Sequence, residues 1–396
     1  MSWEKVEIGD LVTLRQGFAI NKKTKHHMSE VPTNLHLLRI GDMKEGNFSI
    51  YVKDTIPEKF IAKEDDIIYT RTGQVGLVFR RQYGVVHNNC FTVSSNDNEI
   101  LMQEFLFYAL QEKSFYEEAV SRATGAAQPD LPHGAFSSIK IFLPPIEIQK
   151  KIIDNLDKLN NLIDNNQKQI KLLEEAAQRL YKEWFVDLRF PGYEACKIVD
   201  GVPEGWERKK ISDLGEIVTG KTPSTSKEQY YGGDVPFVKI PDMHNCVYPI
   251  TTETTLTVEG ANTQKNKYIS KNSIMVSCIA TVGLVNIAVD DCQTNQQINS
   301  IVLNNEEDLY FVYSSMKRLK ALLEGVGSNG ATMTNVNKTK FANLELLYPE
   351  DKIVKLYYDF CEPIFKKIYS LSLGKVELSQ MRDILLPKLM SGEIEI

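Results

Sequence analysis

Two stretches of the sequence carry apolar residues at intervals of four and three positions, and each predicts one long helix. The first stretch begins after Pro145, and between its apolar positions it is almost wholly polar (DNLDKLNNLIDNNQKQIKLL). Steps of four and three that persist for more than four heptads are typical of a coiled-coil seam. The first predicted seam comprises Ile152, Leu156, Leu159, Ile163, Asn166, Ile170, Leu173, Ala177, Leu180 and Trp184.

The second stretch repeats this spacing about 205 residues later, and Gly374 is expected to loosen its helix locally. A polar helix with one narrow apolar stripe needs a partner, and the other stretch is the most economical one. The alternative, in which each helix packs on its own globular domain, stays open. Asn166 either fixes the register of the pair or is a tolerated polar residue near solvent. The second seam comprises Tyr357, Cys361, Ile364, Ile368, Leu371, Leu378, Leu385 and Leu389, with Lys375 and Arg382 as polar exceptions.

These stretches belong to a repeat that covers the whole chain. The openings WEKVEIGDLVTLRQG and WERKKISDLGEIVTG match, and so do LLRIGDM with FVKIPDM and QVGLV with TVGLV. Further on, GAAQPDLPHGAFSSIKIFLPP lies over GATMTNVNKTKFANLELLYPE without a gap. Four matches in the same order indicate a duplicated unit. In both halves a proline stop separates a predicted strand from the long helix.

The globular part of each half mixes short β-rich runs with helical segments, which predicts an α+β fold. DDIIYTRTG and VGLVFR have the character of strands, whereas ILMQEFLFYALQEKSFYEEAVSR has apolar residues at helical spacing. A seam of ~33 residues corresponds to a rod of roughly 50 Å. The predicted boundaries are a first globular domain at 1–143, a long helix at 144–190, a linker at 191–205, a second globular domain at 206–348 and a long helix at 349–396.

Composition narrows the function classes. The chain of 396 residues is 42% hydrophobic and 25% charged, which is ordinary for a globular protein, and no apolar run is long enough to span a bilayer. Six scattered cysteines without a C-x-x-C pair argue against a zinc ribbon and fit the cytoplasm. The histidines also lack metal-ligand spacing, so no metal site is expected. A net charge of −6 excludes a globally basic nucleic-acid binder, but RQGFAINKKTKHH is a local basic patch.

One segment, GEIVTGKT (residues 215–222), fits the phosphate-loop pattern of nucleotide hydrolases. The preceding WERKKISDL is too polar for a central parallel strand, and Pro223 disfavours a helix directly after Thr222. The equivalent VTLRQGFA of the first half lacks the Lys-Thr pair, so nucleotide hydrolysis is disfavoured. We expect GEIVTG to end a domain-opening helix and Gly-Lys-Thr to lead into a turn. No other catalytic constellation has more than one supporting feature.

Together, these features resemble the specificity (HsdS) subunits of type I restriction–modification systems over essentially the whole chain. The likeness is carried by the repeated W-E-x-x-x-I-x-D-L openings, TGKTPST (219–225), TRTGQVG (70–76), KIFLPPIEIQKKI (140–152) and LLPKLMSGEI (385–394). The resemblance implies a tandem pseudo-two-fold repeat of two target-recognition domains, with the two long helices paired as an antiparallel coiled coil. The first half has QGFAINKK in place of the family's G-x-T-P element, which is therefore incomplete there.

The resemblance also implies what the chain does and with what it works. It would have no chemistry and no cofactor of its own. It would hold two methyltransferase subunits, which use S-adenosylmethionine to methylate adenine, and restriction subunits, which use ATP and Mg. Each recognition domain would read one half of a split, asymmetric site in double-stranded DNA, in the cytoplasm and without a membrane.

Candidate DNA contacts follow from the side chains that read base edges or hold phosphates. For about half of them, an ordinary solvated surface is the alternative. A coiled-coil scaffold that does not read DNA, and less favourably a nucleotidase, remain alternative functions. The candidates of the first half are Lys22, Lys23, Lys25, Arg71, Thr72, Gln74, Arg80, Arg81, Asn88 and Asn89. Those of the second half are Lys221, Thr222, Ser224, Lys227, Asn295, Gln296 and Gln297.

Overall fold

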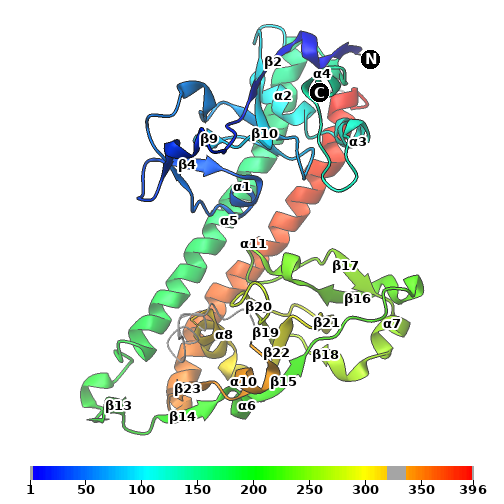
Figure 1. The fold of residues 1–396 in the computed structure, drawn as a ribbon. Helices are drawn as coiled ribbons and strands as arrows, with labels where there is room; N and C mark the ends of the chain where they lie inside the picture. Colours follow the sequence, from blue (N-terminus) through cyan, green and yellow to red (C-terminus); the bar gives the residue numbers. More distant parts are fainter. Residues whose placement is uncertain (1–2, 319–335, 395–396) are drawn as a thin grey trace. The chain divides into compact units, whose positions relative to one another are not determined.

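The computed structural model describes residues 3–318 and 336–394 and divides the chain into two compact units. The first unit consists of Met1–Asn161 and Leu378–Ile396, and the second of Leu162–Glu377. Each unit combines small sheets with helices, as Figure 1 shows, so the predicted α+β class is confirmed. Each unit also contains one end of each long helix.

The first unit contains three sheets. β1 (Glu4–Glu7) pairs with β11 (Lys140–Leu143), which joins the start of the globular domain to its last strand. The second sheet has the order β2 (Val12–Gln16), β10 (Cys90–Ser95), β7 (Ile67–Thr70) and β8 (Val78–Phe79), all antiparallel. The third has the order β3 (Met28–Ser29), β5 (Tyr51–Val52), β4 (Leu35–Leu38), β9 (Gly84–Val86) and β6 (Ile61–Ala62). The short helices are α1 (Ile40–Glu45), α2 (Gln103–Ala109), α3 (Lys113–Arg122) and α4 (His133–Ser137).

The second unit is built from the same kinds of sheet. β14 (Glu207–Lys210) pairs with β23 (Glu345–Tyr348), and β12 (Ile198–Val199) forms a short hairpin with β13 (Val202–Pro203) in the predicted linker. The second sheet has the order β15 (Gly215–Thr219), β22 (Ile298–Leu303), β19 (Ile274–Ser277) and β20 (Val285–Ile287). The third has the order β17 (Thr254–Leu256), β16 (Tyr231–Val238), β21 (Cys292–Thr294) and β18 (Tyr268–Ile269). The short helices are α6 (Ile211–Leu214), α7 (Val258–Asn262), α8 (Leu309–Lys317) and α10 (Lys338–Ala342).

Strand order confirms the duplication. The sheet β2-β10-β7-β8 corresponds to β15-β22-β19-β20, and β5-β4-β9-β6 corresponds to β17-β16-β21-β18. In the latter pair of sheets the same two strands run parallel, β4 with β9 and β16 with β21. The first unit adds only the edge strand β3. Four weak sequence matches therefore mark two domains of one topology.

The domain openings differ from the prediction in one respect. The GEIVT segment is the strand β15, paired antiparallel with β22 along its whole length, and is not the end of a helix. The only helix there is the single turn α6, which Asp213 caps by accepting a hydrogen bond from the backbone N–H of Lys210. Within β15, Gly215, Ile217 and Val218 are buried and Glu216 is exposed, so the strand is covered on both faces at Ile217 and Val218. The helical turn directly before it obscures this strand in the sequence.

The long helices are α5 (Ile146–Phe185) and α11 (Asp351–Ser391), of 40 and 41 residues. Both begin just after the prolines that end β11 and β23, as predicted. The helix α11 stays helical through Gly374, where a side-chain Cβ would lie 3.4 Å from Nδ2 of Asn166. At this distance an added Cβ would be in ordinary van der Waals contact, so the approach of Asn166 does not require glycine at position 374.

The two helices pair along the predicted seam within each unit. In the first unit, Ile152 and Leu156 share a core with Leu386 and Leu389. In the second unit, the Tyr357 hydroxyl donates to the carbonyl of Ala177 at 3.2 Å, and Lys375 Nζ donates to Gln167 at 2.5 Å. As residue numbers increase along α5, the numbers of the partner residues on α11 decrease, so the two helices are antiparallel. All predicted seam positions are buried or half-buried.

The cores show that both packing alternatives are partly right. The first-unit core combines the seam residues with Phe91, Phe105 and Phe136 of the globular domain. The second-unit core likewise contains Tyr313, whose hydroxyl donates to Glu174 of α5 at 2.6 Å. The helix stripe therefore packs on the partner helix and on globular domains together.

This packing predicts a difference between two leucines of α5. Leu156 is 0% exposed in the first-unit core, whereas the Leu172 side chain is 64% exposed. Leu156→Ala leaves a cavity, so we expect it to lower the free energy of unfolding by about 2–5 kcal/mol. Leu172→Ala should change it by less than about 0.5 kcal/mol. Urea denaturation of the isolated chain, followed by circular dichroism, measures both, and equal losses would contradict the seam.

Candidate nucleic-acid interface

In the second unit, the loop after β15 lies against the turn that joins β21 to β22. A Cβ at Gly220 would overlap the carbonyl oxygens of Thr294 and Asn295, so only glycine permits this approach. Lys221 N donates to the carbonyl of Thr294 at 2.9 Å. Thr222 Oγ1 donates to Gln296 Oε1 at 2.7 Å, which brings together two candidate residues that are distant in sequence.

Two buried glutamines fix the position of this loop through hydrogen bonds. Gln264 is 4% exposed and donates from Nε2 to the carbonyl of Lys221 at 2.6 Å and to Gln293 Oε1 at 2.8 Å. Gln293, 0% exposed, donates in turn to the carbonyl of Ala261 at 2.9 Å. The Lys221 side chain is exposed. A backbone held by hydrogen bonds thus presents an exposed cation, which suits a phosphate contact. No sequence signal marks either glutamine, since neither belongs to a motif.

Some of the other candidates of the second half have exposed side chains, whereas others are buried or make hydrogen bonds within the protein. Gln296 is exposed, whereas Asn295 is buried and donates to Gln297 Oε1 at 3.0 Å, so Asn295 shapes the turn. Lys227 Nζ donates to the hydroxyl of Tyr230 at 3.0 Å. The hydroxyl of Ser224 shares a 2.9 Å hydrogen bond with that of Ser226.

The first unit repeats this arrangement at the corresponding positions. A Cβ at Gly17 would overlap the carbonyl of His87, just as at Gly220. Asn88 and Asn89 form the turn between β9 and β10, the counterpart of the turn between β21 and β22. Gln16 Nε2 donates to the carbonyl of Asn88 at 2.7 Å. Both halves therefore place amide side chains on the same turn, as predicted.

The three lysines of the first half lie in the loop that follows Gly17. The side chains of Lys22, Lys23 and Lys25 are exposed. Hydrogen bonds from Asn21 N to Thr24 Oγ1 and from Lys23 N to Asn21 Oδ1 shape the loop around them. Within residues 3–318 and 336–394, their ammonium groups have no ion-pair partner. This loop is the strongest cluster of available positive charge among the first-half candidates.

The Asp130 carboxylate accepts hydrogen bonds from both Arg71 and Thr72. Arg71 Nη2 and Nε donate to Asp130 at 2.6 and 3.2 Å, and Thr72 Oγ1 donates to the same carboxylate at 2.5 Å. Arg71 Nη1 donates to Gln16 Oε1 at 3.0 Å. The neighbouring Gln74 is exposed. Arg71 and Thr72 therefore shape the turn that presents Gln74.

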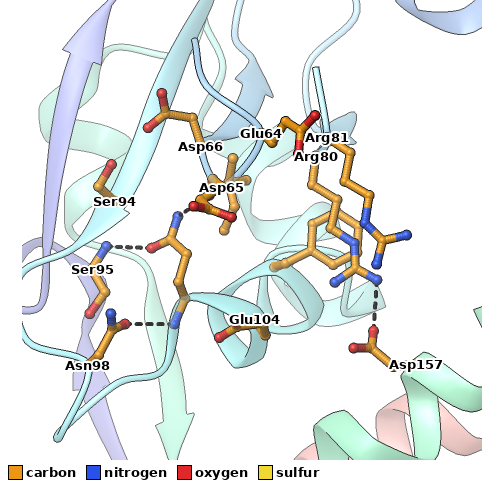
Figure 2. A pocket seen from close by; sticks show the side chains of 13 residues that line it. Glu64, Asp65, Asp66, Arg80, Arg81, Ser94, Ser95, Asn98, Glu104 and Asp157 are labelled. Carbon is orange, nitrogen blue, oxygen red and sulfur yellow. Dashed lines mark hydrogen bonds and ion pairs between the residues drawn. The ribbon is translucent and has the colours of Figure 1, made fainter. Parts of the chain in front are cut away.

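Arg80 and Arg81 face a different part of the first unit, a cavity of about 570 Å³. In Figure 2, Arg80 points to Asp157 of α5, and the two are 2.7 Å apart. The Arg80 guanidinium also lies 4.3 Å from the centre of the Phe107 ring. The cavity lining adds the carboxylates Glu64, Asp65, Asp66 and Glu104. This acidic excess disfavours a phosphate in the cavity itself, and a contact of Arg80 or Arg81 with DNA stays a prediction.

The phosphate-loop match has no structural support. The strand β15 lies at the edge of an antiparallel sheet, whereas a phosphate loop follows a buried strand of a parallel sheet. After Thr222, the next element is the single 3₁₀ turn η5 (Glu228–Tyr230), and no α-helix starts at the loop. The cradle of a helix N-terminus is therefore missing.

Membrane-spanning helices and metal-binding clusters are both absent from the part of the chain that the structure describes. There, no helix is both long and apolar enough to cross a membrane. No group of three or more histidine, cysteine, aspartate or glutamate side chains in residues 3–318 and 336–394 could hold a metal ion.

Known proteins match the chain over nearly its whole length. A family model described as the type I restriction modification DNA specificity domain matches residues 1–175 and 203–375. The chain is 31% identical to the type I restriction enzyme HindI specificity subunit of Haemophilus influenzae, with 99% of each chain covered. It is 25% identical to the MjaIX specificity subunit of Methanocaldococcus jannaschii, over 86% of this chain and 82% of that one. The S subunit structure from M. genitalium, 15% identical, shares the fold with a TM-score of 0.55 over 98% of this chain and 96% of that one.

The chain therefore belongs to the family of type I restriction–modification DNA specificity subunits, as the resemblance implied. Subunits of this family are not catalytic, so the chain is not an enzyme. This family membership and the absent helix after Thr222 both exclude the nucleotidase alternative.

Asp130 provides a test of the first-unit turn. Hydrogen bonds from Arg71, and then from Thr72, lower the pKa of Asp130 against the opposing effect of desolvation. Because the folded pKa lies below the ordinary value of 3.8, the stability from this carboxylate is present above that value and is lost as the pH falls through the folded pKa. The difference in unfolding free energy between the wild type and Asp130→Asn should stay constant from about pH 7 to pH 5 and shrink below about pH 4. Urea denaturation across this range measures it, and a difference that grows on acidification would contradict the assignment.

Proposed function

We propose that this chain is the DNA-reading subunit of a type I restriction–modification enzyme and that it recognises a bipartite, asymmetric site. One observation carries the proposal. The two halves share a strand order and a glycine-dependent contact between loop and turn, but they present different side chains there. Asn88, Asn89 and Gln74 occupy the first half, and Lys221, Thr222 and Gln296 the second. Two recognition domains that share one topology but present different polar side chains suit two different half-sites.

The charge distribution supports local rather than global contact with DNA. The net charge of −6 repels DNA overall, so this chain's own attraction to DNA comes from the exposed lysines in the two loops. Lysine ammonium groups suit phosphates, whereas the amides of Asn and Gln can bond base edges. We assign Lys22, Lys23, Lys25 and Lys221 to the backbone of DNA.

The proposal includes partner subunits that supply the chemistry. Two methyltransferase subunits would bind this chain and use S-adenosylmethionine, and restriction subunits would use ATP and Mg. These subunits would also provide phosphate contacts that an acidic chain lacks. The complex would act in the cytoplasm, where its DNA substrate lies. A coiled-coil scaffold that does not read DNA remains the competing function.

Exchange of one reader tests the proposal. Replacing residues 1–143 with the corresponding domain of another specificity subunit should change one half of the methylated sequence and leave the other half unchanged. Replacing residues 206–348 should do the reverse. Sequencing of methylated DNA from cells that carry each hybrid measures the outcome. A change in both halves, or in neither, would argue for the scaffold.

The lysine loop predicts a change in salt dependence. The triple variant Lys22→Ala, Lys23→Ala and Lys25→Ala should flatten the slope of log K against log[salt] by up to about 2.7, since each lost phosphate contact removes about 0.9. The control triple variant carries alanine at Lys5, Lys113 and Lys140, which are exposed in the same unit outside the loop. Titration of labelled duplex by the complex with its methyltransferase measures both. Equal slopes for the two variants would remove the loop from the interface.

A further inference from the structure

The ion pair of Arg71 with Asp130 joins three separate segments of the first unit. Asp130 lies between α3 and α4 and accepts two hydrogen bonds from Arg71 and one from Thr72. The same guanidinium donates to Gln16 at the end of β2. Arg71 follows β7 directly. One planar guanidinium thus ties together the ends of β2 and β7 and the loop that contains Asp130.

Backbone hydrogen bonds extend this connection to the candidate reading residues. Arg71 N and Thr72 N donate to the carbonyl of Asn89 at 2.8 and 3.2 Å, which binds the asparagine turn to the same segment. Gly73 N donates to the carbonyl of Pro129 at 2.8 Å. The segments that contain Gln74, Asn88 and Asn89 therefore belong to one hydrogen-bond network, and Asp130 is part of that network.

The adjoining loop is itself closed and exposed. Thr124 and Asp130 exchange two backbone hydrogen bonds, of 2.9 and 2.8 Å, and the side chains between them include the exposed Gln128. Leu131 N donates to the carbonyl of Arg71 at 2.9 Å and anchors the far side of the loop. The Asp130 pair is thus placed to set the position of the Gln128 amide as well as that of Gln74.

The second half lacks this pair. Strand pairing places Thr70 opposite Cys90 and Ser277 opposite Ile298, so the next residues, Arg71 and Cys278, correspond. Val336 N donates to the carbonyl of Cys278 at 2.8 Å, as Leu131 N does to that of Arg71. The residue before Val336 is Asn335, which stands in the sequence where the first half has Asp130. A cysteine and an asparagine cannot form an ion pair, so these two positions of the second half do not repeat the pair of Arg71 and Asp130.

Arg71 therefore has the character of a residue that holds the surrounding loops in place more than that of a residue that contacts bases. Its Nε, Nη1 and Nη2 atoms all donate within the protein, and its side chain is only 19% exposed. A guanidinium held in this way is not available for the two-pronged contact with guanine that makes arginine a base reader. The amides around it are available.

We propose that Asp130 is a positioning residue for specificity: by holding Arg71 and Thr72, it fixes Gln74, Asn88, Asn89 and Gln128 in the arrangement that reads the first half-site. The inference rests on the proposed function. It assigns to the carboxylate of Asp130 an effect on discrimination in the first half of the target.

The test uses the full chain in complex with its methyltransferase subunits and four duplexes. One duplex carries the intact site found by methylation sequencing, two have one half scrambled, and one has both halves scrambled. Asp130→Asn should weaken binding to the intact duplex about tenfold, as expected for about 1.4 kcal/mol. It should also reduce discrimination against the scrambled first half while leaving discrimination against the scrambled second half at the wild-type level.

Two further variants separate positioning from general destabilisation. Asp66→Asn breaks a comparable ion pair with Arg15, of 2.8 Å, in the same unit and should leave both discriminations unchanged. Thr72→Val removes one donor to Asp130 while retaining Arg71, so it should cause a smaller loss in the first half alone. This milder variant keeps the test valid if Asp130→Asn fails to fold.

Each outcome decides between the claims. If the wild type discriminates in both halves and the Asp130 and Thr72 variants keep its first-half discrimination, the positioning role is wrong and the proposed function stands. Equal losses in both halves would also overturn the positioning role. If the wild-type complex binds the doubly scrambled duplex as tightly as the intact one, the proposed function itself fails and the inference fails with it.

Discussion

The narrow apolar stripe of α5 is the constraint on which the rest of the structure depends. A polar helix of 40 residues with one such stripe leaves its apolar side chains in water unless another surface covers them. The cover comes from α11 and from the globular domain in each unit. Because α11 follows the second domain in the sequence, the stripe cannot be covered fully until both halves of the chain exist. The core of each unit therefore contains side chains from both halves of the chain.

The two duplicated domains share the same contact between a loop and a turn, but they present different polar side chains at that contact. Gly17 and Gly220 allow the same close approach between a loop and a turn, and this contact determines where the polar side chains emerge. The supports behind this contact differ, however. The second half uses the buried amides of Gln264 and Gln293, whereas the first uses the ion pair of Arg71 with Asp130. Different supports allow the two surfaces to diverge independently, which is what an asymmetric site requires.

Periodicity and repetition predicted the architecture well, because burial of a stripe and duplication leave regular marks in a sequence. The seam, the proline junctions and the equivalence of the two amide turns were predictable in this way. The sequence pattern wrongly predicts a helix end at Gly215–Thr219, since a single helical turn precedes this strand without a break. Contacts between distant residues were also invisible. Nothing local in the sequence shows that Arg80 meets Asp157 or that Gln264 supports Lys221. Which individual side chains touch DNA stays a prediction.

The central claim is that one chain directs methylation to two different half-sites. The most direct measurement is a genome-wide map of methylated adenines in cells that express the chain with its methyltransferase, compared with cells that lack only this chain. The account predicts a single split motif with two unlike halves, separated by unspecified bases, and its complete loss without the chain. A continuous or symmetric motif, or methylation that persists without the chain, would contradict it.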